Sequence, residues 1–312
     1  MNKKKFKNVL VVQGGTSGER KISLETGKAC IKALKNKGYK VLIFDPKIKN
    51  FNLIKKNKID VIFNALHGKD GEDGVAQSYF EYLKIPYTHS GVIPSFNAMD
   101  KIISKKIFIK NKIRTPKFFS IKKLDYKPNK IWKLINIKKI SFPIVIKPTN
   151  EGSSIGVEIC KDKKKLNRST HCLFKKYDEL IFEEYIGGQE VQVAVINGNS
   201  LGAIELIPKR LFYDYKAKYT KKAKTKHVMP AKLKKKKYNE VLKIAQKTHK
   251  VLNCRGVTRS DFKFFKGNFY LLELNTQPGM TSLSLVPEIA SFAGVSFENL
   301  VEKILLDASI NK

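Results

Sequence analysis

The chain has 312 residues, of which 42% are hydrophobic and 29% are charged, so it has enough apolar side chains for a folded core. This composition excludes wholesale disorder and a small disulfide-stapled scaffold. With 62 Lys and Arg against 27 Asp and Glu, the net charge of +35 first suggests a nucleic-acid-binding protein. Because the lysines are spread over the whole chain, together with much Ile and Asn, a compositional drift of exposed positions explains the charge equally well.

The cysteines and the apolar runs indicate the cellular compartment of the protein. Its cysteines, Cys30, Cys160, Cys172 and Cys254, lie far apart without a C-x-x-C pair, which predicts reduced thiols in a cytosol. The apolar run Val9–Val12 is shorter than the ~7–15 residues of a signal-peptide core, so we interpret it as part of a strand. No apolar stretch approaches the ~20 residues of a membrane span, and we expect no bilayer crossing.

The first hundred residues alternate short apolar runs with amphipathic ones. Strands are predicted at Lys7–Gln13, Tyr39–Asp45 and Ile59–Leu66, with a helix from about Ser23 to Lys37 that Gly38 closes. Strands separated by helices imply a parallel sheet with right-handed crossovers. Such sheets bind ligands at the carboxyl ends of their strands, where the segments GGTSGER and HGKDGEDG both lie.

After Pro94 the pattern changes. Ser95 is predicted to cap a helix through the Met99–Lys110 region. Further strands are predicted at Pro143–Pro148 and Glu179–Ile186, followed by a hairpin turned at Asn197-Gly198. The lysine-rich segment 216–237 has almost no apolar periodicity and is predicted to be a loop, and the next segment an amphipathic helix.

The stretch RSDFKFFKGNFYLLELNTQPG carries the most information. A Lys-Gly-Asn turn separates two alternating segments, which predicts a β-hairpin centred on Gly267. Counting equally outward places Asp261 opposite Glu273 and Arg259 opposite Asn275. Side chains alternate along a strand, so these four residues are expected on one face of the hairpin.

Opposed carboxylates on this hairpin predict a cation. Side chains directly across a strand pair have Cβ atoms about 4.5–5.5 Å apart, so two carboxylates there repel each other. Asp, Glu and Asn are oxygen ligands that suit Mg²⁺, which takes further ligands from substrate phosphates. The hairpin therefore predicts a site for a magnesium nucleotide. A solvent-facing hairpin with a surface Arg–Asp pair is the alternative, and a bulge in the turn would shift the register by one residue and undo the pairing.

A glycine-rich loop, Glu151–Gly156, follows Lys147 on its predicted strand. Backbone amides of such a loop can cradle phosphates while a strand lysine neutralises them. Taken alone, the loop also fits an ordinary Gly/Ser turn between strands. No G-x-x-x-x-G-K-[ST] motif occurs, and Gly14–Gly18 does not satisfy G-x-G-x-x-G, so nucleotide binding would need another fold.

Seven separated blocks resemble the ATP-grasp ligases and, within them, the D-alanine–D-alanine ligases. They are GGTSGERKIS, ALHGKDGEDG, MDKIISK, IKPTNEGSSIGV, FYDYKAKY, RGVTRSDF and LLELNTQPGMTSLSLVP, in that family's order. The resemblance implies an α/β fold in which an N-terminal parallel α/β domain precedes two α+β domains that clasp ATP. We expect domains at 1–97, 98–186 and 187–312.

The same resemblance implies the activity and its nucleotide site. The family joins two D-alanines with cleavage of ATP to ADP and phosphate, for peptidoglycan precursors in the cytoplasm. Residues matched to ATP binding are Lys101, Lys147 and Lys218 at the phosphates, Glu183 and Glu190 at the adenine and ribose end, and Tyr185 with Ile186 at the hinge. The family's metal trio matches Asp261, Glu273 and Asn275, which would hold two Mg²⁺ ions, with Mn²⁺ as a substitute.

For the first D-alanine, the resemblance assigns the ammonium to Glu19, with Ser153 and Tyr219 as its hydrogen-bonding partners. As a lone acid in a loop, Glu19 could equally be a surface charge. His67 matches a histidine near this substrate, with orientation as its role. Tyr219 in place of Phe is the form associated with dipeptide rather than D-alanyl-D-lactate synthesis.

For the second D-alanine, Ser284 and Leu285 match the pocket for the carboxylate. In the implied mechanism, a carboxylate oxygen of the first D-alanine attacks the γ-phosphorus, and the second amine attacks the resulting acyl phosphate. Arg259 and the backbone amide of Gly279 would stabilise the oxyanion.

Two rival functions remain beside this one. An ATP-grasp ligase for another carboxylate–amine pair is the closer rival. A nucleic-acid-binding protein is the more distant one, because the chain has neither RNP-like aromatics nor a helix-turn-helix signature. The resemblance further implies a homodimer formed mainly by the N-terminal domain, with no nucleic acid or membrane as partner. The segment 216–237 is far more basic than usual for the family.

Overall fold

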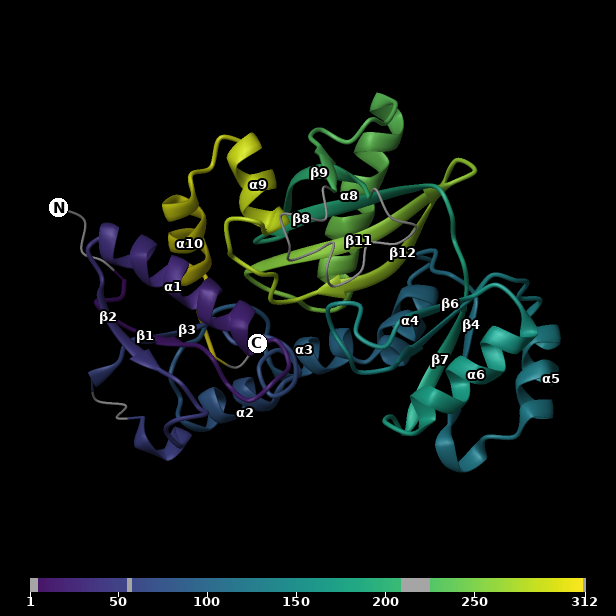
Figure 1. The fold of residues 1–312 in the computed structure, drawn as a ribbon. Helices are drawn as coiled ribbons and strands as arrows, with labels where there is room; N and C mark the ends of the chain where they lie inside the picture. The colour runs from purple at the N-terminus through teal and green to yellow at the C-terminus, as the bar shows by residue number, and fades with distance from the viewer. Residues whose placement is uncertain (1–4, 55–57, 209–224, 311–312) are drawn as a thin grey trace.

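The N-terminal part is a small parallel sheet covered on both faces. The computed structural model describes residues 5–54, 58–208 and 225–310 (Figure 1). Strand β1 (Asn8–Val12) lies between β2 (Lys40–Phe44) and β3 (Val61–Asn64), and both pairings are parallel. Helix α1 (Arg20–Asn36) ends before Gly38, whose φ of 75° is the predicted left-handed cap. The three predicted strands and the helix between the first two are confirmed.

Three helices connect this sheet to the rest of the chain. They are α2 (Val75–Tyr82), α3 (Val92–Met99) and α4 (Lys101–Lys110). The prediction that Ser95 caps the helix through Met99–Lys110 is wrong, because Ser95 lies inside α3. Asp100 is the cap of α4, and its Oδ1 accepts hydrogen bonds from the backbone amides of Ile102 and Ile103.

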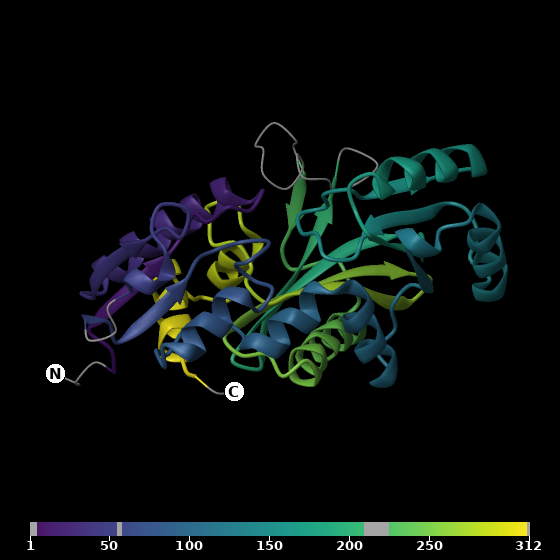
Figure 2. The same ribbon diagram turned by 90° about the horizontal axis from the view of Figure 1, so that it is seen from below.

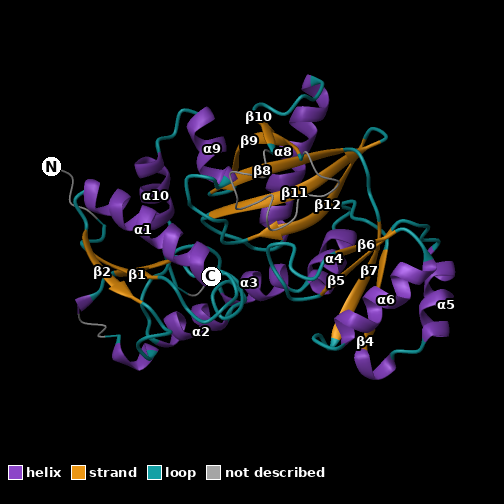
Figure 3. Ribbon diagram, viewed as in Figure 1, coloured by secondary structure: helices purple, strands orange, loops and turns teal. Residues whose placement is uncertain are grey.

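The central sheet is antiparallel, in the order β4-β7-β5-β6. Its strands are β4 (Phe118–Lys122), β5 (Ile144–Pro148), β6 (Glu158–Cys160) and β7 (Glu179–Glu184). Helices α5 (Pro128–Lys138) and α6 (Lys163–Phe174) pack on it through a core that includes Ile131, Leu166 and Phe182 (Figure 3). The opposite face of this sheet, with Val145, Lys147 and Glu183, lines a cavity described below.

The C-terminal sheet is also antiparallel, in the order β10-β9-β8-β11-β12. Its strands are β8 (Gln189–Ile196), β9 (Asn199–Ile207), β10 (Lys226–Val228), β11 (Val257–Phe265) and β12 (Asn268–Asn275). Helix α8 (Lys235–Val251) packs on one face through Val241 and Ala245. The predicted turn at Asn197-Gly198 is confirmed, because Ile196 pairs with Asn199.

The loop predicted for 216–237 is corrected by β10 and by the start of α8. Residues 209–224 lie outside the described part of the chain, but Lys226–Val228 pairs with β9 and α8 begins at Lys235. Lysines are tolerated both in a three-residue edge strand and on the solvent face of a helix. Neither β10 nor the start of α8 therefore has an apolar pattern from which it could be predicted.

The β11–β12 hairpin differs from its predicted form while keeping the predicted pairs. The turn is the two-residue Lys266-Gly267, with Phe265 paired to Asn268, so the hairpin is not centred on Gly267. A bulge at Leu272 then adds one residue to β12, and beyond it Asp261 lies opposite Glu273 and Arg259 opposite Asn275. The alternative of a bulge in the turn is not what the structure has: the bulge lies within β12 and gives the predicted pairs.

The chain's last helices return to its first sheet. Helix α10 (Phe297–Leu306) lies beside α1, while α9 (Leu285–Phe292) packs on β8 and β9 and contacts α10; the C-terminal helices are yellow and α1 is purple in Figure 2. One buried cluster accordingly joins Val9 and Phe63 with Ile289 and Ile304. The boundary predicted near Asn97 falls inside α3, and the division into 1–97, 98–186 and 187–312 stays a proposal.

Candidate active site

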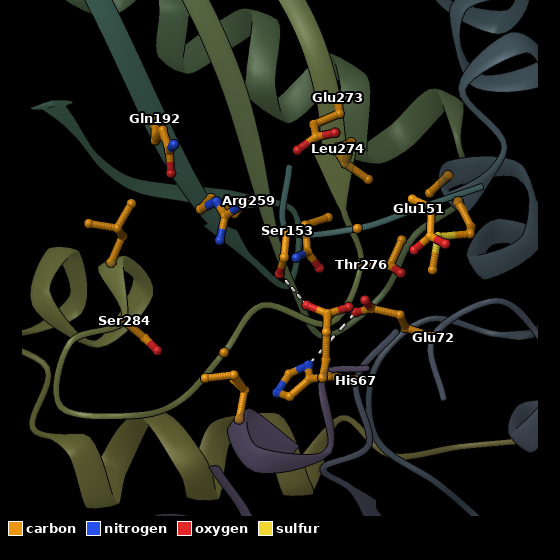
Figure 4. Close-up of a pocket in the computed structure, with 18 of the residues that line it drawn as sticks. His67, Glu72, Glu151, Ser153, Gln192, Arg259, Glu273, Leu274, Thr276 and Ser284 are labelled. Carbon is orange, nitrogen blue, oxygen red and sulfur yellow. Dashed lines mark hydrogen bonds and ion pairs between the residues drawn. The ribbon is translucent and has the colours of Figure 1, made fainter. Parts of the chain in front are cut away.

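A cavity lies where the three parts of the chain meet (Figure 4). Its walls come from the loops after β1 and β3, the glycine-rich loop 151–156, the face of β11 and β12, and the segment leading into α9. Ten of the predicted site residues line it: Glu19, His67, Lys101, Ser153, Arg259, Glu273, Asn275, Gly279, Ser284 and Leu285. We call it the amino-acid cavity.

A second cavity lies between the central and C-terminal sheets. The remaining predicted site residues that the structure describes line it: Lys147, Glu183, Tyr185, Ile186, Glu190 and Asp261. Lys101 and Glu273 line it as well. We call it the nucleotide cavity. Lys101, Glu151 and Glu273 line both cavities, so the two meet there. The predicted residues Lys218 and Tyr219 lie outside the described residues.

Glu19 is enclosed by loops from two parts of the chain. It stands at the N-terminus of α1, is only 6% exposed, and accepts a hydrogen bond from Ser153 Oγ of the glycine-rich loop. A Cβ on Gly68 or Gly152 would lie 2.7 or 2.9 Å from Glu19 Oε2, so both backbones need glycine to approach this carboxylate. The burial rules out a simple surface charge and provides an anionic end for the amino-acid cavity.

The His67 ring is held from two sides. Its Nε2 lies 3.1 Å from Thr26 Oγ1 on α1, and its Nδ1 lies 3.8 Å from Glu72 Oε2 (Figure 4). Glu72 also accepts a hydrogen bond from the Gly68 amide at 2.9 Å. Thr26 and Glu72 were not predicted as site residues, although Glu72 belongs to the acidic HGKDGEDG segment. The fixed ring suits a role in orientation.

The face of the hairpin brings four predicted residues together. Arg259 and Asp261 form a two-contact ion pair, with Nε–Oδ1 at 2.7 Å and Nη2–Oδ2 at 3.0 Å. Their side chains are 15% and 7% exposed, so the solvent-facing alternative for this Arg–Asp pair is wrong. Glu273 stands opposite Asp261 and points into the cavity (Figure 4). The Oδ1 of Asn275 accepts a hydrogen bond from the backbone amide of Gln277 at 2.8 Å, and this bond orients the Asn275 side chain.

Glu183 lies between two lysines. Its Oε2 is 2.7 Å from Lys147 Nζ and its Oε1 is 2.9 Å from Lys105 Nζ. Burial alone would raise the pKa of Glu183, but the two ammonium groups outweigh it and hold this pKa below its usual value. Both carboxylate oxygens are therefore already engaged by cations. Lys105 was missed, although it follows Lys101 by four residues and so shares its helix face.

The nucleotide cavity contains another ion pair, between β8 and β11. Glu190 on β8 lies directly opposite Lys263 on β11, with Oε2 3.0 Å from Nζ. Lys263 was also missed, although it continues the series Arg259, Asp261 on one strand face. Along this face of β11 the charges therefore alternate in sign.

Ser284 is held at the start of α9 by a local turn. Its Oγ accepts a hydrogen bond from the Thr281 amide at 2.9 Å and lies 2.9 Å from Thr281 Oγ1. A Cβ on Gly279 would lie 2.9 Å from Ser284 Oγ, so the backbone of Gly279 passes close to this hydroxyl. The turn presents a hydroxyl and a glycine backbone to the same end of the amino-acid cavity.

Comparison with known proteins identifies the family. The profile described as "D-ala D-ala ligase C-terminus" matches residues 107–306, and "D-ala D-ala ligase N-terminus" matches residues 45–90. The chain belongs to the D-alanine–D-alanine ligase family. A ligase of this family from Pelagibacter ubique (strain HTCC1062) is 58% identical over 98% of this chain and 99% of its own length. One from Citrifermentans bemidjiense is 41% identical, with 98% and 97% covered.

Solved ligase structures agree with the fold. The crystal structure of D-alanine–D-alanine ligase from Bacillus anthracis is 35% identical and superposes with a TM-score of 0.85, covering 96% of this chain and 97% of that one. The same enzyme complexed with ATP gives a TM-score of 0.83 at 32% identity. The predicted ATP-grasp fold of this ligase, with its parallel sheet and two antiparallel sheets, is confirmed.

Proposed function

We propose that this chain joins two D-alanine molecules into D-alanyl-D-alanine while it cleaves ATP to ADP and phosphate. One observation carries the proposal: the amino-acid cavity and the nucleotide cavity meet at Lys101, Glu151 and Glu273. A triphosphate in one cavity would thus point its last phosphate at a carboxylate in the other. The product is a building block of peptidoglycan, made in the cytoplasm.

Two buried lysines of the nucleotide cavity are placed to meet phosphates, and one of them, Lys101, also lines the amino-acid cavity. Lys101 and Lys147 are both 7% exposed, and the Lys101 ammonium donates to the backbone carbonyl of Glu151. These two lysines, with Lys218, would contact the phosphates of ATP. Glu190 would receive the ribose, and Tyr185 with Ile186 the adenine. Because its carboxylate is ion-paired on both oxygens, Glu183 would act on the nucleotide through Lys147.

A divalent cation fits the donor set on the hairpin. Asp261, Glu273 and Asn275 offer oxygen ligands, two of them anionic and directly opposed. In the described part of the chain, no three His, Cys, Asp or Glu side chains form a metal-binding group. Two carboxylates and one amide would therefore hold an ion only together with phosphate oxygens and water. Mg²⁺ has that preference, with Mn²⁺ as a substitute, and would offset phosphate charge.

At the two ends of the amino-acid cavity, the residues differ in charge. The first D-alanine would place its ammonium at Glu19, beside Ser153, with His67 orienting it. The carboxylate of the second would lie at the Ser284 hydroxyl, against Leu285. This polarity directs the carboxylate of the first molecule and the amine of the second towards the middle of the cavity.

The reaction then proceeds in two displacements. An oxygen of the first carboxylate attacks the γ-phosphorus, and ADP leaves with an acyl phosphate formed. The neutral amine of the second D-alanine attacks the acyl carbon, an N–C bond forms, the amine releases its proton, and phosphate leaves. Arg259 and the Gly279 amide would stabilise the oxyanion, with a contribution of about 3–4 kcal/mol for such a donor.

Phosphate release from ATP tests the function. It should be measured with D-alanine, with L-alanine, with D-lactate and without an amino acid, and the product identified by mass. We expect D-alanine alone to stimulate release and to yield the dipeptide. Stimulation only by another acid or amine would favour the rival ATP-grasp ligase. Absence of any stimulation would remove the proposal.

A homodimer is the proposed assembly. Apolar side chains on α2 and α3 are exposed, at 54% for Val75, 79% for Tyr82, 65% for Ile93 and 51% for Phe96. A Cβ on Gly74 would lie 3.6 Å from Phe96 Cβ, so the start of α2 lies against α3 and these side chains gather in the N-terminal part. Sedimentation equilibrium should give a dimer that Phe96→Glu shifts to monomer. A monomeric wild-type protein at micromolar concentration would refute this assembly.

No nucleic-acid or membrane partner is proposed. Among the described residues, no helix combines the length and apolar character that a bilayer crossing requires. The charge of +35 predicts attraction to any polyanion, and such binding should weaken steeply as salt rises.

A further inference from the structure

Lys105 is a completely buried cation beside the nucleotide cavity. Its side chain is 0% exposed, and its Nζ lies 2.9 Å from Glu183 Oε1 on β7 and 2.6 Å from Thr115 Oγ1. Thr115 in turn donates to the backbone carbonyl of Leu271 on β12 at 2.8 Å. One ammonium group therefore connects helix α4, the central sheet and the C-terminal sheet.

Lys105 is connected to Lys147 and to Lys101, the two lysines that line the nucleotide cavity. Glu183 receives Lys105 on one oxygen and Lys147 on the other, at 2.7 Å. Lys101 lies one helical turn before Lys105 on α4, and its backbone amide donates to the Thr149 carbonyl at 3.1 Å. Lys101 and Lys147 line the nucleotide cavity, whereas Lys105 stands behind Glu183.

We infer that Lys105 is a positioning residue for ATP: by holding Glu183 it sets the place of the Lys147 ammonium, and by anchoring α4 it sets the place of Lys101. The inference rests on the proposed function only in naming ATP as the ligand. Lys105 does not touch the nucleotide. It keeps two cations in a fixed geometry, so that they need not reorganise when the phosphates arrive.

The charge balance around Glu183 supports this role. Lys105, Lys147 and Glu183 carry a net charge of +1 in a buried place, which favours an anion next to them. Burial lowers the pKa of Lys105 to about 8, while Glu183 and Glu273 raise it and Lys147 lowers it further. The ring of Phe118 lies 5.5 Å from the ammonium and adds no titrating group.

ATP binding to the full-length protein tests the inference by titration calorimetry with Mg²⁺ present. Lys105→Met keeps the length of the side chain and removes its charge. We expect the Kd for ATP and the KM for ATP to rise about tenfold or more, within the ~100-fold that a displacement of about 1 Å can cost. The KM for D-alanine should change less than about twofold, since the amino-acid cavity keeps its residues. Lys106→Met, an exposed neighbour on α4, is the matched control.

Two further readouts separate positioning from general stability. In a double-mutant cycle, Lys105→Met should have a clearly smaller effect on ATP binding in a Glu183→Gln background than in the wild type, because its route through Glu183 is already lost. Wild-type affinity for ATP should fall above about pH 8, where the Lys105 ammonium loses its proton, and Lys105→Met should be weak and flat there. If Lys105→Met does not fold, Thr115→Val removes the hydroxyl partner and should weaken ATP binding in the same direction.

The outcomes distinguish this inference from the proposed function. Wild-type ATP affinity in Lys105→Met, or effects of Lys105→Met and Glu183→Gln that simply add, would overturn the positioning role and leave the ligase intact. A wild-type protein that binds no ATP would remove the proposed function itself.

Discussion

At the scale of single residues, three of the cavity carboxylates are each held by a lysine or arginine of the protein. Asp261 has Arg259, Glu190 has Lys263, and Glu183 has Lys105 and Lys147. In each pair, the ammonium or guanidinium group holds the carboxylate in one position, and the interaction is strong because little water reaches it. The site is thus organised before any ligand is bound, and it loses less entropy on binding.

The opposed pair Asp261 and Glu273 gives the sharpest residue prediction. Asp261→Asn and Glu273→Gln each remove one anionic ligand without changing shape, so turnover should fall by about 100-fold or more while the fold persists. Phosphate release at limiting Mg²⁺ measures the loss, and thermal unfolding checks the fold. Asp125→Asn, an exposed acid with 59% of its side chain accessible, is the control. Near-normal turnover in either cavity variant would contradict the metal assignment.

At the scale of elements, the bulge that takes up Leu272 decides where Glu273 points. Without the bulge at Leu272, the tight Lys266-Gly267 turn would place Glu273 on the face that α8 covers. The bulge returns Glu273 to the face of Asp261, while Leu271 stays in the core opposite Phe262. A two-residue turn and a bulge together give the register that a symmetric three-residue turn would give.

Deletion of Leu272 tests this geometry. Leu272 is the extra residue of the bulge, so its deletion leaves a regular ladder in which Glu273 follows Leu271 and stays opposite Asp261. ATP-dependent phosphate release should therefore be largely retained, in contrast to Glu273→Gln. Leu272→Val keeps the strand length and serves as the control, with turnover within about twofold of wild type because similar apolar volume is kept. Loss of turnover to the level of Glu273→Gln in the deletion variant would contradict this account of the register.

Elements with a strong local signal could be predicted from the sequence. The parallel strands and the turn at Asn197-Gly198 follow from apolar runs and turn residues. The cap at Asp100 was missed because Ser95 is an equally good cap by type, and only the chain path decides between them. The short edge strand β10 was missed because its pairing with β9 is tertiary and leaves no periodicity.

The site itself was predictable only where residues lie in one motif. The hairpin face follows from alternation along two strands, and the family resemblance supplied Glu19 and Ser153 as partners. Neither alternation nor spacing reveals that Glu183 joins Lys105 to Lys147, since these residues come from three distant segments. Such contacts arise only when the central sheet and α4 pack together.

At the scale of the whole molecule, the two ends of the chain stabilise each other. Helices α9 and α10 bury Ile289 and Ile304 against Val9 of the first strand, and Arg255, just before β11, donates to the His89 carbonyl at 2.5 Å. The N-terminal sheet therefore depends on the C-terminal helices for one of its faces. Loosening one part should destabilise the amino-acid cavity, because its walls come from both.

Buried neutral histidines predict how this assembly responds to acid. Burial lowers the pKa of His249 to about 4 and that of His89 to about 3, from an ordinary value of 6.5. As pH falls below 6.5, the histidines of the unfolded chain are protonated before the buried ones of the folded chain. The free energy of unfolding therefore decreases as pH falls from 6.5 towards 4, by about 1.4 kcal/mol per pH unit for each histidine.

The variant His249→Gln tests this prediction. It keeps a partner for Thr258 Oγ1, 2.9 Å from His249 Nδ1, and removes one titrating group. The free energy of unfolding in urea should then depend less steeply on pH between 4.5 and 6.5, while His171→Gln, on the exposed side of α6, should keep the wild-type slope. Equal slopes in all three proteins would mean that His249 is not buried in its neutral form.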